Sequence, residues 1–321
     1  MSTTPNVTDW KLSDLQNHLA MAIDLEFWTI PFYRVAYHSL DSSHSAARTA
    51  IDEVSQQEMY HCQCAWNIAQ AFGTSYDFTK RTFAYEGTTI PHLDFSLESP
   101  NPATTGVTIG GNSYNFSNYS AKLDASTFAE RINAMCLVEY PDWAAPTSQE
   151  LKPNISEYPS IGHFYGAIKT LLNETTPQAF SNGDLVSDSI TGGGTSQTAL
   201  FTGLAPAGEK VTSSGTAGMA QINALINAIV EEGEGTSSSP GSVPAAYQFD
   251  NTTDPHFDSF LTVYNDGLTQ KTMNSGGAAN IMAALPTFLT ALQAQFESGG
   301  NSSGFMGAMY AFDGVISSQF S

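Results

Sequence analysis

A carboxylate and an imidazole interrupt the apolar stripe of one predicted helix. In residues 51–72 apolar side chains recur at helical spacing, and the stripe contains Ile51, Val54, Ala65, Ile68 and Phe72. Glu58 and His61 occupy the two positions that continue this stripe between Val54 and Ala65. Because residues three apart lie on one helix face, the pair presents an oxygen and a nitrogen ligand to a common point. This spacing predicts half of the ligand set of a di-iron carboxylate site.

A second carboxylate interrupts the preceding helix, which is predicted at about 9–37. Glu26 continues its apolar stripe, which is made of Leu12, Leu15, Leu19 and Ala22. Pro31 removes one backbone hydrogen bond, so we expect a kink just after Glu26. The short connection 41–44 should join the two helices as an antiparallel hairpin. Glu26 then supplies the single carboxylate that a ferritin-like four-helix bundle places opposite a Glu-x-x-His pair.

A metal is one of three explanations for a carboxylate on an apolar face. An unpaired buried carboxylate is costly, so Glu58 must be protonated, paired with a cation or bound to a metal. The chain has 11 Lys and Arg residues against 31 Asp and Glu, which makes a charge pair harder to arrange. Iron accepts carboxylate and imidazole ligands together and leaves room for oxygen. We therefore predict one or two iron ions, with manganese and copper left open, and a buried hydrogen-bonded pair of Glu58 and His61 as the alternative.

The composition argues against several classes of function. A formal net charge of −20 repels nucleic acid and anionic lipid, so we expect no nucleic-acid partner and no membrane partner. No apolar run approaches the roughly 18 residues that a membrane span needs. The N-terminal residues lack the features of a secretory signal, which predicts a cytoplasmic location. The three cysteines cannot form a disulfide framework and are interpreted as reduced thiols.

The periodicity of the remaining chain predicts an all-α protein, a four-helix bundle with long loop insertions. Further helices are expected at about 125–139, 160–172, 217–232, from near 254, and at about 277–296. Two stretches lack helical periodicity and should be irregular insertions, at about 74–124 and 182–216. The first should contain a short β-hairpin around Gly110 and Gly111. The whole chain, 1–321, is expected to form a single domain.

Five blocks of the sequence resemble one known family. In chain order they read "LQNHLAMAIDLEFWTIPFYRVAYHSL", "EMYHCQCAWNIAQAFG", "YPSIGHFYGAIKTLL", "IVEEGEGT" and "DPHFDSF". Their order and wording resemble the ferritin-like iminophenyl-pyruvate dimer synthase family, whose members occur in bisindole pigment biosynthesis. The likeness covers most of the helical chain from residue 10 to 265. It implies a ferritin-like bundle, a metal held between helices, and redox chemistry on an amino-acid-derived substrate.

The resemblance also implies candidate metal ligands. Glu26, Glu58 and His61 fit the ligand-bearing positions of the family's first two helices. The block "IVEEGEGT" corresponds to Ile-x-Glu-Gln-Gly-Glu-Gly in the family, which points to Glu231 and Glu234. The periodicity of that helix disagrees in part, because it places Glu231 on the side away from the buried stripe.

The last ligand-bearing block departs from the family pattern. His256 matches the family's histidine before an aromatic residue, but Thr253 stands where a carboxylate is expected three residues earlier. This departure implies one metal ion rather than two, or another side chain such as Asp254 in the vacant position. His163 is a candidate substitute because it replaces a Glu of the family's corresponding block, and an ordinary hydrogen-bonded histidine is the alternative. Glu139 ends a helix before a proline and is ranked below His163.

These features together predict a metal-dependent oxidoreductase with non-haem iron as its cofactor. The expected substrate is a small amino-acid-derived metabolite, with oxygen as a further candidate reactant. The resemblance implies oxidative coupling of an imine or enamine. Two alternatives stay open, namely a metal-binding ferritin-like protein without turnover and a structural helical bundle. The sequence leaves the substrate's identity and the oligomeric state open.

Overall fold

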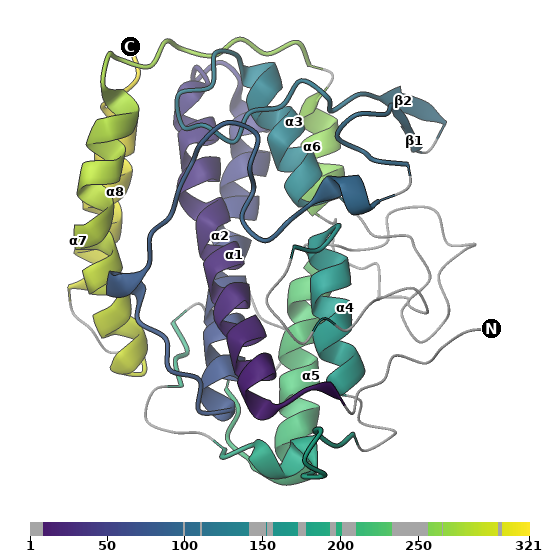
Figure 1. Cartoon of the computed structure of the whole chain (residues 1–321). Helices are drawn as coiled ribbons and strands as arrows, with labels where there is room; N and C mark the ends of the chain where they lie inside the picture. Colours follow the sequence, from purple (N-terminus) through teal and green to yellow (C-terminus); the bar gives the residue numbers. More distant parts are fainter. Residues whose placement is uncertain are drawn as a thin grey trace.

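The protein is built mainly from helices, as its computed structural model shows (Figure 1), and the predicted all-α class is confirmed. The structure describes residues 9–98, 100–109, 111–140, 152, 157–172, 178–192, 197–200, 210–232, 256–264, 266–300 and 304–321. Its α-helices are α1 (Leu12–Ser39), α2 (Ser45–Ala71), α3 (Phe128–Val138), α4 (Ile161–Leu171), α5 (Gly215–Glu232), α6 (His256–Tyr264), α7 (Gly277–Glu297) and α8 (Phe305–Ser317). Within these residues, no helix combines the length and the apolar character that a membrane crossing requires.

The first two helices form the expected hairpin, and they are the longest of the described helices. α1 is buried on every side from Met21 to Tyr33, because α2, the first insertion and other helices surround it. Pro31 lies inside α1. Glu26 lies near the middle of α1, and Glu58 lies near the middle of α2. Side chains from other elements can therefore reach them only where those elements contact the middle of the hairpin.

Two pairs of shorter helices take the place of the third and fourth long helices of a four-helix bundle. α3 packs against α6 at one end of the hairpin, and α4 packs against α5 at the other end (Figure 1). α2 contacts both α5 and α6. The short helices therefore end near the middle of α1 and α2, which is the level of Glu26 and Glu58.

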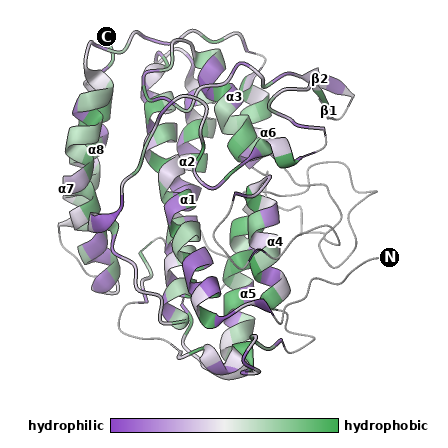
Figure 2. Ribbon diagram, in the orientation of Figure 1, coloured by the Kyte–Doolittle hydropathy of each residue, from purple (hydrophilic) through white to green (hydrophobic). Residues whose placement is uncertain are grey.

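A second hairpin, made of α7 and α8, lies along the outside of the bundle, where α8 packs against α1 (Figure 1). α7 agrees with the helix predicted at about 277–296, whereas α8 was not predicted. Gly307 and Gly314 weaken the intrinsic helix preference of α8, and its buried residues are Phe305, Phe312 and Ile316. Hydrophobic residues nevertheless predominate along α8 (Figure 2). Packing on α1 and α7, rather than intrinsic propensity, therefore stabilises this helix.

The stretch 74–124 is a loop insertion that covers one side of α1. Its regular elements are the 3-10 turns η2 (Phe78–Lys80) and η3 (Phe95–Leu97) and the antiparallel strands β1 (Val107–Ile109) and β2 (Asn112–Tyr114). The strands enclose the expected hairpin turn, in which Gly111 has a φ of 82° and Gly110 lies outside the described residues. The second expected insertion, 182–216, is described only in part, with the 3-10 turn η5 (Val186–Ser189) and the start of α5 at Gly215.

Asp24 on α1 anchors the beginning of the first insertion. Its carboxylate accepts hydrogen bonds from Arg81 Nε at 2.8 Å and from the Tyr76 hydroxyl at 2.7 Å. Four residues further along α1, Trp28 Nε1 donates to the carbonyl of Ala84 at 2.8 Å. These contacts close the side of α1 that the other helices leave open, and they keep the middle of α1 away from water.

Arg131 on α3 anchors the end of the same insertion. The guanidinium is fully buried and donates to the carbonyls of Lys122, Leu123 and Ala125 and to Gln270 Oε1. Burial lowers the pKa of Arg131 to about 10. Since Arg131→Met leaves these acceptors unpaired, it should reduce the free energy of unfolding in urea by about 2–4 kcal/mol. The exposed Lys122→Met is the control, and equal losses in both variants would contradict this role for Arg131.

Candidate metal centre

Glu58, His61 and His256 lie together in the interior between α2 and α6. α2 supplies Glu58 and His61 one turn apart, and His256 is the first residue of α6. Their ligand atoms lie within 4.8 Å of one another. His256 Nδ1 is 2.8 Å from Glu58 Oε1, and His61 Nδ1 is 3.9 Å from the same oxygen. The two imidazole rings stack with centroids 5.2 Å apart, and each of the three residues is at most 2% exposed. Both nitrogens therefore face one carboxylate oxygen in a dry interior.

Two further carboxylates reach this cluster, from the middle of α1 and from the end of α3. Glu26 Oε2 is 3.7 Å from His61 Nδ1, and Glu139 Oε2 is 3.4 Å from His256 Nδ1. Glu139 is the C-cap residue of α3. Both carboxylates are buried. Each histidine therefore faces Glu58 and one further carboxylate.

A buried hydroxyl group holds one oxygen of each of the three carboxylates. Thr29 donates to Glu58 Oε2 at 2.8 Å, Tyr33 donates to Glu139 Oε1 at 2.5 Å, and Tyr165 donates to Glu26 Oε1. In every case the other oxygen is the one that faces a histidine. Hydrogen bonds of this kind fix the orientation of a metal-binding carboxylate. The three carboxylates thus each offer one oxygen to a shared space, as metal ligands would.

The ring nitrogens of His256 show that the cluster suits a cation. Nε2 lies 3.1 Å from Gln57 Oε1, which only accepts hydrogen bonds, so Nε2 carries a hydrogen. Nδ1 approaches Glu58 and Glu139 closely but forms no hydrogen bond of normal geometry. A neutral ring would point its Nδ1 lone pair at carboxylate oxygens, and the lone pair and the oxygens would repel each other. A proton or a metal ion between them removes this repulsion. A histidine that donates from its second nitrogen to an oxygen is the usual arrangement of a metal ligand.

The electrostatics of the cluster follow from the burial of three neighbouring carboxylates. Burial and the charge of Glu58 raise the pKa of Glu26 well above its usual value, and the same two causes raise the pKa of Glu139. Burial would also raise the pKa of Glu58, but the close contact with His256 and the charge of that ring outweigh it and lower that pKa. For His256, burial is outweighed by Glu139 and Glu58, which raise its pKa to about 10. Three acids in a low dielectric thus face two imidazoles, and a bound metal cation would offset their repulsion.

The remaining predicted ligands lie outside this cluster or have side chains that are not described. His163 is in the first turn of α4, where its Nδ1 contacts Ser160 Oγ at 3.0 Å. It is not part of the three-residue group on α2 and α6. Glu231 is in the last turn of α5, but its side chain lies outside the described residues, as do Glu234 and Thr253. Ligation by these residues therefore stays a prediction.

Sequence reasoning ranked Glu139 below His163 as a candidate, and it did not place Tyr33, Tyr165 or Gln57 among the residues that support the ligands. For Glu139 a signal was present, because a carboxylate at a helix C-terminus is unfavourable beside the helix dipole and the residues just before it, from Ala134 to Val138, are apolar and buried. Tyr165 gave no signal, since aromatic residues at helical spacing usually belong to the core. Its contact with Glu26 depends on how α4 crosses α1.

The fold and the cluster together define a class of protein. α1 and α2 carry a Glu and a Glu-x-x-His pair that face inward, and α6 supplies a histidine opposite them. This arrangement is that of the ferritin-like helical bundles, which often bind metal. The sequence matches the family described as Ferritin-like over residues 19–265, and the chain belongs to that family.

A solved structure extends the likeness to nearly the whole chain. The crystal structure of a ferritin-like protein from Caulobacter vibrioides at 1.95 Å resolution is similar to this chain, with a TM-score of 0.75 and 29% sequence identity. The similarity covers 97% of this chain and 96% of that one, so it extends beyond the family match to the α7–α8 hairpin. No curated protein sequence matches. The comparisons identify the ferritin-like family and not the narrower synthase family that the five sequence blocks resemble.

The hydroxyl groups that hold the carboxylates should affect metal affinity without being ligands. Tyr165→Phe and Tyr33→Phe are each expected to weaken metal binding about tenfold or more, because a freed carboxylate no longer points one oxygen at the histidines. Titration of metal-free protein with ferrous iron under anaerobic conditions measures this. Tyr85→Phe removes a buried hydroxyl that donates to the Trp28 carbonyl, away from the carboxylates, so it should bind normally. Equal weakening in all three variants would contradict this role.

Proposed function

We propose that this chain is a metal-dependent oxidoreductase with iron as the expected metal. The observation that carries the proposal is His256 Nδ1, which faces two buried carboxylates without a hydrogen bond of normal geometry. Membership of the ferritin-like family supports metal binding. The residues that would hold the metal are Glu26, Glu58, His61, Glu139 and His256.

The donor set suits iron, and the surrounding residues hold the donor set in place. Bound iron would supply redox chemistry with oxygen. Tyr165 and Tyr33 each donate a hydrogen bond to a carboxylate oxygen, and burial and the neighbouring carboxylates raise the pKa of both hydroxyls, so each stays protonated and holds its carboxylate in place. Gln57 fixes the ring of His256, and the burial of the cluster keeps bulk water away. Manganese and copper accept overlapping ligand types and are the other candidates.

We propose a small amino-acid-derived metabolite as the substrate and the oxidative coupling of an imine or enamine as the reaction. The support is the order and wording of the five blocks that resemble the iminophenyl-pyruvate dimer synthase family, which fall largely within the matched residues 19–265. Coupling two such molecules removes two hydrogen atoms, which oxygen can accept. The net charge of −20 makes nucleic acid and anionic membranes poor partners. A cytoplasmic location stays a prediction of the sequence.

Oxygen uptake tests this proposal. Iron-loaded protein should consume oxygen when it is given imines freshly formed from aromatic amino acids by an amino-acid oxidase, after the oxidase's own oxygen use has been subtracted. Uptake should fall at least about tenfold in the Glu58→Ala variant, because a ligand is lost. The exposed Glu53 lies on the same helix, and Glu53→Ala is the matched control. Stoichiometric iron without uptake for any amine or imine would contradict turnover.

A metal-binding protein without turnover is the second candidate, and the depth of the cluster favours it. All five side chains are at most 3% exposed, an arrangement that also suits a metal kept apart from substrates. This candidate shares every ligand with the first. It predicts the same metal content and no oxygen uptake, so the two measurements separate the candidates.

A further inference from the structure

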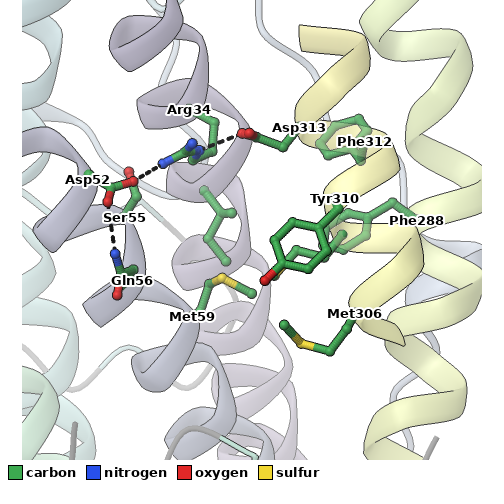
Figure 3. Close-up of a pocket in the computed structure, with 12 residues that line it drawn as sticks. Arg34, Asp52, Ser55, Gln56, Met59, Phe288, Met306, Tyr310, Phe312 and Asp313 are labelled. Carbon is green, nitrogen blue, oxygen red and sulfur yellow. Dashed lines mark hydrogen bonds and ion pairs between the residues drawn. The ribbon is translucent and has the colours of Figure 1, made fainter. Parts of the chain in front are cut away.

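A pocket of about 390 Å³ lies between the α1–α2 hairpin and the α7–α8 hairpin. None of the residues that line it belongs to the metal cluster, although α1 and α2 contribute residues to both. The cluster is completed by residues from α3 and α6, which do not line the pocket. Figure 3 shows that side chains from both hairpins point into it. Its size is within the range of small-molecule sites. The pocket is therefore a candidate site for a ligand other than the one at the metal cluster.

One part of this pocket is apolar and adaptable. Its apolar lining consists of Ile30, Met59, Phe288, Met306, Met309, Tyr310 and Phe312. The Tyr310 ring lies across the space from Met59 (Figure 3). Tyr310 is 67% exposed and Met306 is 42% exposed, although both are large hydrophobic residues. Thioether side chains adjust to flat apolar groups, so this part suits a ring or a short hydrocarbon.

The other part of the pocket is charged, and its charge is negative. Arg34 is paired with both Asp52 and Asp313, and Gln56 donates to Asp52 at 2.9 Å. Figure 3 shows Arg34 between the two carboxylates. Because both partners already bind the guanidinium, Arg34 has little attraction left for an anion. Two carboxylates against one guanidinium leave one net negative charge at this end of the pocket when His38, which contacts Asp313, is neutral.

Asp313 is the carboxylate best placed to meet a ligand. Both Arg34 Nε and His38 Nε2 contact the same oxygen, Oδ1, at 2.8 Å and 2.9 Å. Within the described part of the chain, Oδ2 has no hydrogen bond of its own. Burial is outweighed by His38 and Arg34, which hold the pKa of Asp313 at about 2. This carboxylate is therefore ionised and has an oxygen to spare.

We propose that this pocket binds a small organic cation, an ammonium group carried on a flat apolar body. The body would pack against Met59, Met306 and Tyr310, and the ammonium group would donate to Asp313 Oδ2. The face of the Tyr310 ring adds a favourable site for positive charge. The net charge of the whole chain raises the local concentration of cations around the pocket. This site is independent of the proposed function at the metal cluster.

Calorimetric titration of the full chain with three matched indole probes tests the proposal. The probes are tryptamine, a cation, indole-3-propionamide, which is neutral, and indole-3-propionate, an anion. Tryptamine should bind about tenfold or more tightly than either of the others. Tyr310→Ala and Asp313→Asn should each weaken tryptamine about tenfold, and added salt should weaken it in the unchanged protein. Leu97→Ala removes another exposed large hydrophobic residue outside the pocket and should bind tryptamine normally.

Four outcomes would overturn the proposal. The first is the absence of tryptamine binding at about 10 mM. The second is equal binding of the cation and the anion. The third is tryptamine binding that neither Tyr310→Ala nor Asp313→Asn changes, which would indicate a diffuse charge effect. The fourth is a dimer in sedimentation experiments that Tyr310→Ala converts to a monomer, because a second copy of the chain would then cover the pocket. Since Tyr310 is exposed, its variant should fold even if Asp313→Asn does not.

Discussion

Protein that carries Glu58→Ala and His61→Ala together is expected to retain less than about one tenth of the iron, manganese or copper bound by the unchanged protein. The two changes remove an oxygen and a nitrogen that point to one place from the middle of α2. The carboxylate oxygen that faces both His61 and His256 is also lost. Elemental analysis of both proteins measures the effect, first as purified without added metal and then after anaerobic loading with ferrous iron.

The control for this result is Glu53→Ala, which removes an exposed carboxylate from the same helix and should leave the metal content unchanged. Metal retained in the double variant would place the metal elsewhere. If neither protein binds metal even after loading, Glu58 and His61 are a buried polar pair. In that case replacing them by Leu and Met should be neutral or stabilising, because well-packed apolar residues can replace a buried polar pair without loss of stability.

Glu139→Ala is expected to weaken metal binding about 100-fold, whereas His163→Ala should change it by less than about threefold. The reason is the position of each side chain. Glu139 Oε2 is 3.4 Å from His256 Nδ1, while His163 Nδ1 contacts Ser160 Oγ near the start of α4. Anaerobic titration of the metal-free variants with ferrous iron compares them directly.

Glu139→Gln provides the control for this second prediction. Glu139→Ala also removes the acceptor of the Tyr33 hydroxyl, and an unpaired buried hydroxyl destabilises the fold by about 1–3 kcal/mol. The amide keeps an acceptor for Tyr33 and loses the charge. Normal metal binding by Glu139→Gln would show that Glu139 is only a structural partner of Tyr33. A larger loss in His163→Ala than in Glu139→Ala would instead support His163 as the ligand.

The fold was predictable wherever apolar residues recur at helical spacing over many turns. α2 was predicted at about 45–72 and spans Ser45–Ala71, and α7 agrees equally well with its prediction. α8 was missed, because its glycines lower helix propensity and its apolar residues are not confined to the face that carries the buried Phe305, Phe312 and Ile316. Its stability comes from contacts with α1 and α7, which no local pattern records.

The metal cluster was predictable on the helices that carry a local spacing signal and, through the family resemblance, at His256. Glu58 and His61 are three residues apart, and the helix alone brings them to one face. Glu139 and Tyr165 have no such signal. Tyr33 and Glu139 are 106 positions apart, and Glu26 and Tyr165 are 139 apart. Their contacts depend on how the short helices of the bundle end against α1.

The sequence by itself determined the helical class of this protein, its α1–α2 hairpin, and the inward direction of Glu26, Glu58 and His61. Those properties follow from the period of the α-helix, which acts over a few residues and is readable in any window of the chain. Only the tertiary structure decided that Glu139 joins the cluster from the end of α3, that His256, which the family resemblance had indicated, lies beside Glu58, and that tyrosines fix the carboxylates. It also created the charged pocket beside α8. These contacts join residues far apart in the chain, and packing between helices, which leaves no period in the sequence, brings them together.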